Sequence, residues 1–323
     1  MLNRVLILLS GENSTLPEAE ARTLLEAYDP KAVIRRLEPR VLVAKTRVDP
    51  DVIASRVAYA RRVGVLVSRG QISGELREKI KHTSFRLRRF TLAPSRARIE
   101  QLEKKLLGEL DGRVDLSNPD YEVTIVAARR VYVAITRPRK LSQNWVSRRP
   151  RRRAFFHPAA IFPKLSRALV NLSGVREGQT LLDPFAGTGS IPLEAFTVGI
   201  LPVAIDISRA MVRGALANRR EFAQSWLGII QADANRMPIY KVDGIVTDVP
   251  YGRASSAYGE MTSEIVERLI GLAAKLLDPG KVMVLMHPDS VKIKRVKGFR
   301  NQGAHYLYIH RKLTRVITVL RRT

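Results

Sequence analysis

The sequence predicts an α/β protein whose second half forms a doubly wound, mainly parallel sheet and whose first half consists of two smaller α+β units. Three observations support this prediction. The chain has 323 residues, which exceeds one average domain. From about residue 154, apolar runs of strand length alternate with longer segments of helical period. Before residue 138, strand-like and helix-like segments follow one another in a less regular order.

The first half divides into two predicted units. In residues 1–50 the runs VLILLS and RVLVAKT flank LPEAEARTLLEAY, whose Leu, Ala and Tyr recur at helical spacing, so we expect a strand, a helix and further strands. In residues 51–138 we expect a helix near 51–62, the apolar run VGVLVS, the basic segment REKIKHTSFRLRRF, a helix in SRARIEQLEKKLLGEL, and the strand pair YEVTIVAA and RVYVAIT. The basic segment is either an ordinary solvated surface or a phosphate contact.

A basic linker separates the two halves. Residues 137–153, RPRKLSQNWVSRRPRRR, carry eight Lys or Arg and almost no aliphatic residues. Such a run is either a solvated linker or a strap that contacts phosphates, and the sequence leaves both open. We assign residues 139–156 to this linker and residues 157–323 to the second-half domain.

The second-half domain alternates strand and helix along its length. IFPKLSRALVNLSG predicts a helix, TLLDPF a strand, SIPLEAFTVG a helix, PVAIDI a strand and MVRGALANRREFAQ a helix. IIQADA and DGIVTDVPYG predict strands, SEIVERLIGLAAKLL an amphipathic helix and KVMVLMHP a buried strand. In such sheets ligands collect at the carboxyl ends of the strands. The tail HYLYIHRKLTRVITVLRR predicts an antiparallel hairpin at the sheet edge.

Composition restricts the partners. The chain has 56 Lys and Arg against 30 Asp and Glu, a formal charge of +26, which favours a polyanionic partner. A membrane surface is the main competitor, but no apolar run reaches the roughly 20 residues that span a bilayer, so we expect no membrane partner. The absence of cysteine excludes disulfides, thiolate zinc sites and a Cys nucleophile. Five scattered histidines lack metal-ligand spacing, so we expect no metal.

The strongest motif is LLDPFAGTGSIPLEA, residues 181–195. Asp183 ends a predicted strand and Gly187-Thr188-Gly189 forms a turn in which backbone amides can approach a ligand. A dinucleotide fingerprint needs a third glycine where Pro192 stands, so that alternative is disfavoured. Asp206 ends the next strand, where an acid can accept from both ribose hydroxyls, and Asp233 ends the third, placed to accept from an adenine amino group. Each acid alone could instead be a helix N-cap.

A second motif, TDVPYGR, ends the fourth strand. Methylating an aryl amine is difficult because its lone pair is delocalised into the ring, so an enzyme must hold and polarise the NH2 group. Asp248 and the backbone carbonyl of Val249 are suitable acceptors for its two N–H groups. Tyr251 offers a face for base stacking, and Pro250 stiffens the loop. The alternative is a β-turn with an Asp cap and a packed tyrosine.

These motifs carry a resemblance. DPFAGTGS, IDIS, QADA and DVPYG, in this order, resemble the class I methyltransferases of exocyclic amines, whose fourth-strand signature is Asp or Asn, Pro, Pro and an aromatic residue. HPAAIFPKLSRALVNLSGV before LLDPFAGTGS resembles the archaeal-type tRNA guanine-10 N2-methyltransferases. Residues 85–135 are similar to the second half of a THUMP domain, an RNA-binding module of that family. The resemblance implies a ferredoxin-like unit (1–50), THUMP (51–138) and a Rossmann-like methyltransferase domain.

The resemblance also implies roles for individual residues. The cofactor is then S-adenosylmethionine, with Asp183, Gly187 and Gly189 around its methionine part, Asp206 on the ribose and Asp233 on the adenine. The other expected cofactor contacts are His157 and Pro158, from a lid at residues 157–160, and Phe185, Thr188, Ile207 and Ala234. The expected catalytic residues are Asp248, Val249, Pro250 and Tyr251. The implied enzyme is a cytoplasmic monomer that binds tRNA and extrudes a paired guanine at a cost of about a few kcal/mol.

One departure and several alternatives remain. Val249 stands where the family usually has proline, so we expect a less constrained acceptor loop, and one or two methylations stay open. The same signature serves guanine at other RNA positions, adenine N6 in DNA and glutamine in proteins. A non-catalytic RNA-binding protein with a decayed methyltransferase fold is an alternative of another class, but no acid or glycine of the pocket is missing.

Overall fold

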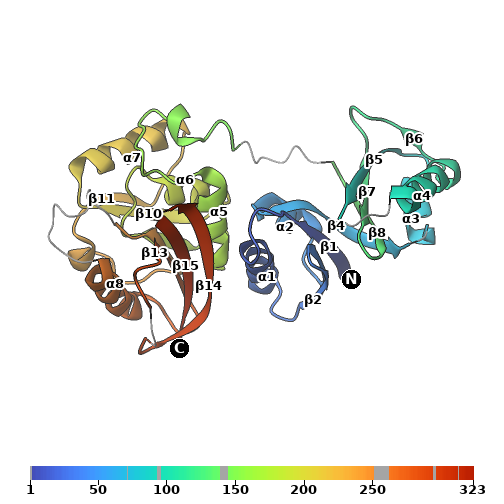
Figure 1. Cartoon of the computed structure of the whole chain (residues 1–323). Coiled ribbons are helices and arrows are strands. Elements are labelled where there is room, and N and C mark those ends of the chain that lie inside the picture. Colours follow the sequence, from blue (N-terminus) through green and yellow to red (C-terminus); the bar gives the residue numbers. More distant parts are fainter. Residues whose placement is uncertain are drawn as a thin grey trace. The chain divides into compact units, whose positions relative to one another are not determined.

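The computed structural model describes residues 2–70, 72–92, 96–138, 145–250, 262–293, 296–311 and 313–323, and within helix α4 the side chains of residues 96–99 and 102 are not described. The chain forms two compact units, residues 1–143 and 144–323 (Figure 1). Of the expected site residues, Tyr251 lies outside the described residues.

The first unit contains a single eight-stranded sheet with the order β2-β3-β1-β4-β8-β7-β5-β6. Its elements are β1 (Asn3–Leu9), α1 (Leu16–Tyr28), β2 (Val33–Glu38), β3 (Val41–Thr46), α2 (Pro50–Arg56), β4 (Ala60–Arg69), α3 (Gly74–Ile80), β5 (Ser84–Thr91), α4 (Arg96–Glu109), β6 (Arg113–Val114), β7 (Tyr121–Ala127) and β8 (Val131–Thr136). Strand β4 joins the early and late parts of the sheet, because it pairs antiparallel with β1 and with β8.

The helix expected over residues 51–62 is shorter than predicted. Helix α2 ends at Arg56, and the chain is already a strand from Ala60. The carboxylate of Glu20, fully buried in α1, accepts the backbone N–H groups of Ala58 and Tyr59 at 2.7 and 2.8 Å. Those amides therefore do not continue the helix, and the chain turns into the sheet.

Strand β1 is the buried centre of this unit. Its residues alternate between two apolar clusters: Val5, Ile7 and Leu9 pack with residues of α1 and α2, and Leu6 and Leu8 pack with residues of β3, β7 and β8. Every residue from 5 to 9 is buried, as expected for a strand covered on both faces. A third cluster packs α3 and α4 against β5, β7 and β8.

The second unit is the predicted α/β domain. Its elements are η1 (Pro150–Arg152), α5 (Pro163–Leu172), β9 (Thr180–Asp183), α6 (Ser190–Phe196), β10 (Leu201–Asp206), α7 (Arg209–Glu221), β11 (Gly228–Gln231), η2 (Ala234–Arg236), β12 (Gly244–Asp248), α8 (Thr262–Leu276), β13 (Val282–Pro288), β14 (Phe299–His310) and β15 (Leu313–Arg322). The sheet order is β11-β10-β9-β12-β13-β15-β14. The first five strands in that order run parallel. The expected antiparallel hairpin, β14 and β15, forms the edge.

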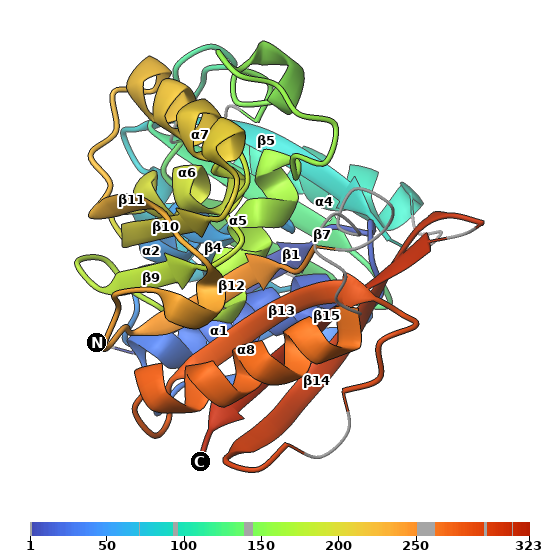
Figure 2. The same cartoon turned by 90° about the vertical axis from the view of Figure 1, so that its left-hand side faces the viewer.

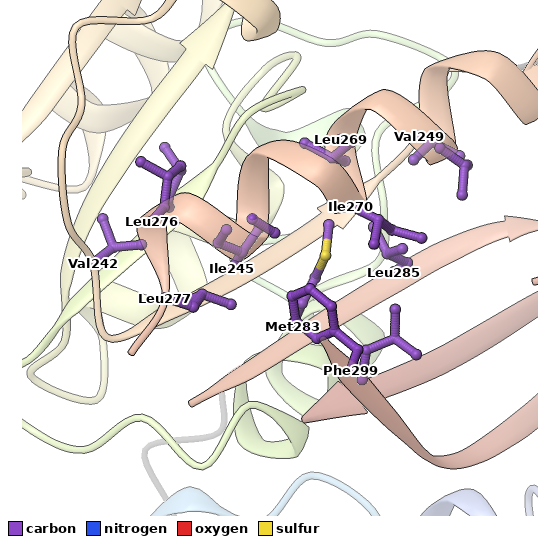
Figure 3. Packing of buried hydrophobic residues seen from close by; sticks show 14 of the residues in the cluster. Val242, Ile245, Val249, Leu269, Ile270, Leu276, Leu277, Met283, Leu285 and Phe299 are labelled. Atoms are coloured by element: carbon purple, nitrogen blue, oxygen red, sulfur yellow. The ribbon is translucent and has the colours of Figure 1, made fainter. Parts of the chain in front are cut away.

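Helices cover both faces of this sheet, with α8 on one side and α5, α6 and α7 on the other (Figure 2). The α8 face holds an apolar cluster in which residues of β12 and β13 face the helix (Figure 3). Within β10, Val203 and Ile205 belong to this cluster, and Ala204 belongs to the cluster of α6 and α7. This alternation fixes which side chains point into each layer and leaves the carboxyl ends of the strands for polar residues. No helix in the described ranges is long and apolar enough to cross a membrane.

Candidate active site

The carboxyl ends of three neighbouring strands each carry an aspartate. Strand β9 lies between β10 and β12, and the three strands end at Asp183, Asp206 and Asp248. Ala204 pairs with Asp183 across one interface, and Ile245 pairs with Leu182 across the other. These three carboxylates therefore lie at one edge of one sheet.

Asp183 is the most deeply buried of the three acids. Its residue is 1% exposed, and one carboxylate oxygen, Oδ1, accepts from the Thr247 hydroxyl at 2.6 Å and from the Phe185 amide at 3.2 Å. Burial raises the pKa of Asp183 to about 8, against the lowering effect of these hydrogen bonds and with a further increase from Asp206 and Asp248. A cation bound beside Asp183 would offset the cost of keeping this buried carboxylate ionised.

The glycine turn after β9 is joined to Asp206. The Gly187 amide donates to Asp206 Oδ2 and the Ser208 amide to Oδ1, both at 2.8 Å. Gly187 has φ +52° and nothing within 4 Å of the position a Cβ would occupy, so its surface is open. Gly189, with φ +84°, has the Trp226 ring 2.4 Å from that position, so a side chain there would clash. Burial raises the pKa of Asp206, and these two amide hydrogen bonds oppose that shift.

Asp233 has the alternative role that the sequence left open. Its Oδ1 accepts from the backbone and side-chain N–H groups of Asn235, at 2.8 and 3.1 Å, and so caps the short η2 helix. The hydrogen bonds of Asp233 in the described part of the chain use Oδ1 and not Oδ2. Nearby, Ala234 is buried and Ile207 is 44% exposed, an unusual position for a large apolar side chain.

Asp248 has no hydrogen-bond partner at Oδ1 among the described residues. Its side chain is 15% exposed, and that oxygen is buried. The nearest cation, Arg315 of β15, holds Nη1 3.8 Å from Oδ2. Burial raises the pKa of Asp248 to about 7, and Arg315 limits the rise. A buried acceptor with an unused oxygen suits a ligand that brings an N–H donor.

Val249, which stands where the family usually has proline, is held by a backbone hydrogen bond and by packing. Its amide donates to the Met286 carbonyl at 3.0 Å, a bond that proline cannot make, and so extends the contact between β12 and β13. Its side chain is 1% exposed within the α8 cluster, where Figure 3 shows it among the labelled core residues. The residue after Asp248 is therefore anchored by packing and hydrogen bonding. Pro250 follows with partial exposure.

The expected lid starts from a fixed segment. Asn218 of α7, fully buried, exchanges hydrogen bonds with the backbone of Phe155 and donates to the Thr188 carbonyl at 3.0 Å. The amide of Ala159 donates to His157 Nδ1 at 3.2 Å, and the His157 ring lies close enough to Asp206 to interact with it electrostatically. Pro158 is exposed. The structure therefore brings residues 155–159, the glycine turn and Asp206 together.

Part of the basic linker is neither a solvated run nor a phosphate strap. Arg148 and Arg153 are 8% and 6% exposed. Arg148 donates to both carboxylate oxygens of Glu194, at 2.6 and 3.3 Å, and Arg167 donates to one of them at 2.9 Å. Arg153 donates to the Ser190 hydroxyl at 2.7 Å, and burial lowers its pKa to about 10. This buried arginine network (Arg148, Arg153, Arg167 and Glu194) ties the linker end to helix α6.

Sequence reasoning missed two parts of this arrangement. Arg315 was placed only in an edge hairpin, and Glu194 only on a helix. The one signal in the sequence was Glu194 itself, an acid on the apolar stretch SIPLEAF, because a fully buried acid needs cationic partners. Its partners could not be named from the sequence.

Acids already pair several arginines of the first unit. Glu122, 5% exposed, lies 2.8, 3.0 and 3.4 Å from guanidinium nitrogens of Arg62, Arg86 and Arg88. Arg89 pairs with Glu103 at 2.9 Å. The positive charge of SFRLRRF therefore includes internal ion pairs as well as surface charge. Among the described residues, no group of three or more His, Asp or Glu could hold a metal ion.

Comparisons with known proteins find similarity to methyltransferases. Residues 150–317 match the family model described as RMKL-like, methyltransferase domain. The chain is 29% identical over 334 residues to the tRNA (guanine(10)-N2)-dimethyltransferase of Methanothermobacter thermautotrophicus, covering 98% of this chain and 99% of the relative. It is 28% identical over 269 residues to the tRNA (guanine(6)-N2)-methyltransferase of Thermus thermophilus, covering 80% of this chain and 75% of the relative.

The fold also has a close counterpart. The crystal structure of TrmN from Thermus thermophilus superposes with a TM-score of 0.52 at 21% identity, and the match covers 99% of this chain and 100% of that one. At this identity the likeness concerns the fold alone. Together with the sequence relatives, it confirms the resemblance that the motifs indicated.

The buried arginine network predicts a large effect of one substitution. Glu194→Gln removes the charge that pairs Arg148 and Arg167, and leaving buried charges uncompensated costs about 3 kcal/mol or more. Both tryptophans, Trp145 and Trp226, lie in the second unit, so urea unfolding followed by their fluorescence measures the free energy of unfolding of that unit.

The matched control is Asp278→Asn, which removes an exposed ion pair with Lys241 and should leave the unfolding midpoint unchanged. Equal midpoints for Glu194→Gln and the control would contradict a structural role of the network.

Proposed function

Because the chain belongs to the family of RMKL-like methyltransferase domains, we propose that it transfers methyl groups from S-adenosylmethionine to the exocyclic N2 amino group of a guanine in tRNA. The relatives named above act on tRNA guanine N2, at position 10 or 6. The relative that spans nearly the whole chain is named for position 10, so we take guanine 10 as the target. The observation that carries the proposal is Asp248, a buried acceptor with an unused oxygen at the end of β12.

The residues at the strand ends fit S-adenosylmethionine. Gly187 leaves open space where any other residue would project a Cβ. Asp206 has two amide hydrogen bonds, and a carboxylate offers about four lone-pair positions, so two remain for ribose hydroxyls. Asp233 keeps Oδ2 for an adenine amino group, and Ile207 offers an apolar face beside it. Asp183 and Phe185 would border the methionine part, with His157 and Pro158 over the cofactor, as the resemblance implies.

The bound cofactor supplies a methyl group made electrophilic by a sulfonium centre. The protein's task is then to present the guanine amino group. Ionised Asp248 accepts one of its N–H bonds, and the Val249 carbonyl accepts the other. Holding both N–H groups shifts electron density toward nitrogen and fixes its direction of attack. The amine loses one proton per transfer, and Asp248 is the nearest assigned group that can take it.

The loop after β12 would hold the base. Pro250 restricts the backbone that follows the two acceptors. Tyr251 provides an aromatic face on which an extruded guanine can stack. With the target nucleotide unstacked, the buried acceptor of Asp248 gains the donor it lacks.

The first unit is assigned to tRNA binding. Strands β1 to β4 with α1 and α2 have the order βαββαβ and the sheet order β2-β3-β1-β4, which supports a ferredoxin-like unit that extends past residue 50 to the end of β4. The remaining elements up to residue 138 then form the THUMP domain, which would grip the tRNA and set which nucleotide reaches the site. The proposal is completed by two further expectations: the enzyme is cytoplasmic, and it acts as a monomer.

The direct test is methylation of unmodified tRNA transcripts with labelled S-adenosylmethionine, followed by digestion and identification of the nucleoside. We expect N2-methylguanosine or its dimethyl form from the wild type. Asp248→Ala should lower the rate at least about a hundredfold, because the removed acceptor acts on the reacting amine. The control Asp278→Asn alters an exposed acid of the same unit and should retain the wild-type rate.

Label in any other nucleoside, or none despite cofactor binding, would contradict the guanine N2 assignment. A transcript with adenine in place of guanine 10 separates position 10 from position 6, because label at guanine 6 would persist on it.

The proposed use of Asp248 also predicts a pH dependence. Activity needs ionised Asp248, whose pKa is raised to about 7, so kcat/KM should fall as pH drops through that region. Arg315 holds this pKa down. Arg315→Gln should therefore move the acidic limb of the profile to higher pH, with activity recovered at alkaline pH.

The matched control is Arg321→Gln, on the same strand but bonded to the Gly280 carbonyl at the other end, which should leave the limb in place. An unmoved limb in Arg315→Gln would exclude this coupling.

A further inference from the structure

The edge hairpin of the second unit extends past the end of the neighbouring strand β13. Strand β14 spans Phe299–His310 and pairs only with β15 within the described residues, so its outer edge is unpaired there. Pro288, the last residue of β13, pairs with Arg315. Residues 308–310 and 313–314 therefore extend beyond the carboxyl end of β13 (Figure 2).

That extension lies on the side of the catalytic residues. Asp248 pairs with Met286, Met286 with Ile317 and Ile317 with His305. Tyr306 is one residue further toward the tip. Three interstrand spacings of about 4.8 Å place β14 roughly 14 Å from β12, which is about four base-stacking steps of roughly 3.4 Å.

The hairpin exposes large aromatic rings. Tyr306 is 60% exposed, Tyr308 is 72% exposed and Ile309 is 47% exposed. Because strand residues alternate faces, Tyr306 and Tyr308 share one face, and on the other His305 is buried and Leu307 partly buried. The packed face holds the hairpin on the domain, and the exposed face keeps two aromatic rings in solvent, an arrangement that packing alone does not require.

The segment that contains these rings is strongly basic. Residues 290–323 contain ten Lys and Arg and no Asp or Glu. Arg300 and Arg311 are exposed on β14 and at the tip. Exposed aromatic faces beside cations are the combination by which proteins bind unpaired nucleotides: the rings stack on bases and the cations contact phosphates.

The shape of the edge argues against a second copy of the chain as the occupant. Strand β14 has two register shifts, between Asn301 and Gly303 and between Tyr308 and His310. Such irregularities, together with exposed arginines, are features that prevent edge-to-edge pairing of sheets. They do not obstruct stacking on a side-chain face.

We propose that the β14–β15 hairpin is an RNA-contact surface of the methyltransferase unit, on which Tyr306 and Tyr308 stack on nucleotides flanking the extruded guanine. Removing guanine from its stack leaves its neighbours without a partner on one side, and the tyrosine rings replace that partner. The identity of the RNA rests on the proposed function, but the stacking surface is defined by the hairpin itself.

The test measures tRNA affinity and methylation for the full chain and three variants. Tyr308→Ala should weaken the Kd for tRNA at fixed salt about fivefold or more, which corresponds to about 1 kcal/mol for one base stack, with kcat at saturating tRNA little changed. Tyr308→Phe keeps the ring and should bind as the wild type does. Tyr240→Ala is the matched control, because Tyr240 is 89% exposed and precedes β12 at the amino end of the parallel strands.

Wild-type affinity in Tyr308→Ala, or equal losses in the Ala and Phe variants, would overturn the proposal. So would a change of oligomeric state in Tyr308→Ala with unchanged tRNA affinity, because the hairpin would then be an interface between copies. A wild-type enzyme that binds tRNA through Tyr308 but transfers no methyl would refute the proposed function and leave the hairpin surface standing. Methylation that is insensitive to Tyr308 would refute only the hairpin surface.

Discussion

Burial of carboxylates at the ends of parallel strands is the constraint on which this molecule depends. Asp183 and Asp248 are largely removed from water, and neither has a cation within hydrogen-bond distance among the described residues. Leaving charges so placed is unfavourable, and the raised pKa values express that cost. The arrangement is relieved by ligands that bring positive charge or N–H donors. A sulfonium cofactor and an aryl amine supply both, so the desolvation that raises the pKa of these acids also favours such ligands.

The rest of the second unit supports these ends. The α8 cluster buries Val249 and so fixes the residue after Asp248. Asn218 joins α7, the glycine turn and the segment that leads to His157. The buried arginine network attaches the end of the linker to α6, the helix that starts directly after Gly189. These contacts hold the start of the second unit in a fixed position relative to the glycine turn.

The sequence predicted the acids because each follows an apolar run in a regular alternation of strands and helices, a pattern that by itself specifies a common sheet edge. It could not assign Asp233 a single role, since capping and ligand binding use the same residue type, and one oxygen does cap η2. Arg315 and the partners of Glu194 were not predictable, because their contacts join distant segments: Arg148 and Glu194 are 46 residues apart. The predicted helix after residue 50 was too long for the same reason, because the contact that ends it comes from Glu20 on another helix.

The claim that Asp248 accepts from the guanine amino group can be measured directly with tRNA that carries inosine, which lacks that group, at the target position. Affinities of wild type and Asp248→Ala for guanine and inosine tRNA form a double-mutant cycle. The account predicts that inosine weakens binding to the wild type but not to the variant, with a coupling of about 1.5 kcal/mol or more for a hydrogen bond to a buried charge. Equal losses in both proteins would show that Asp248 does not contact the amino group.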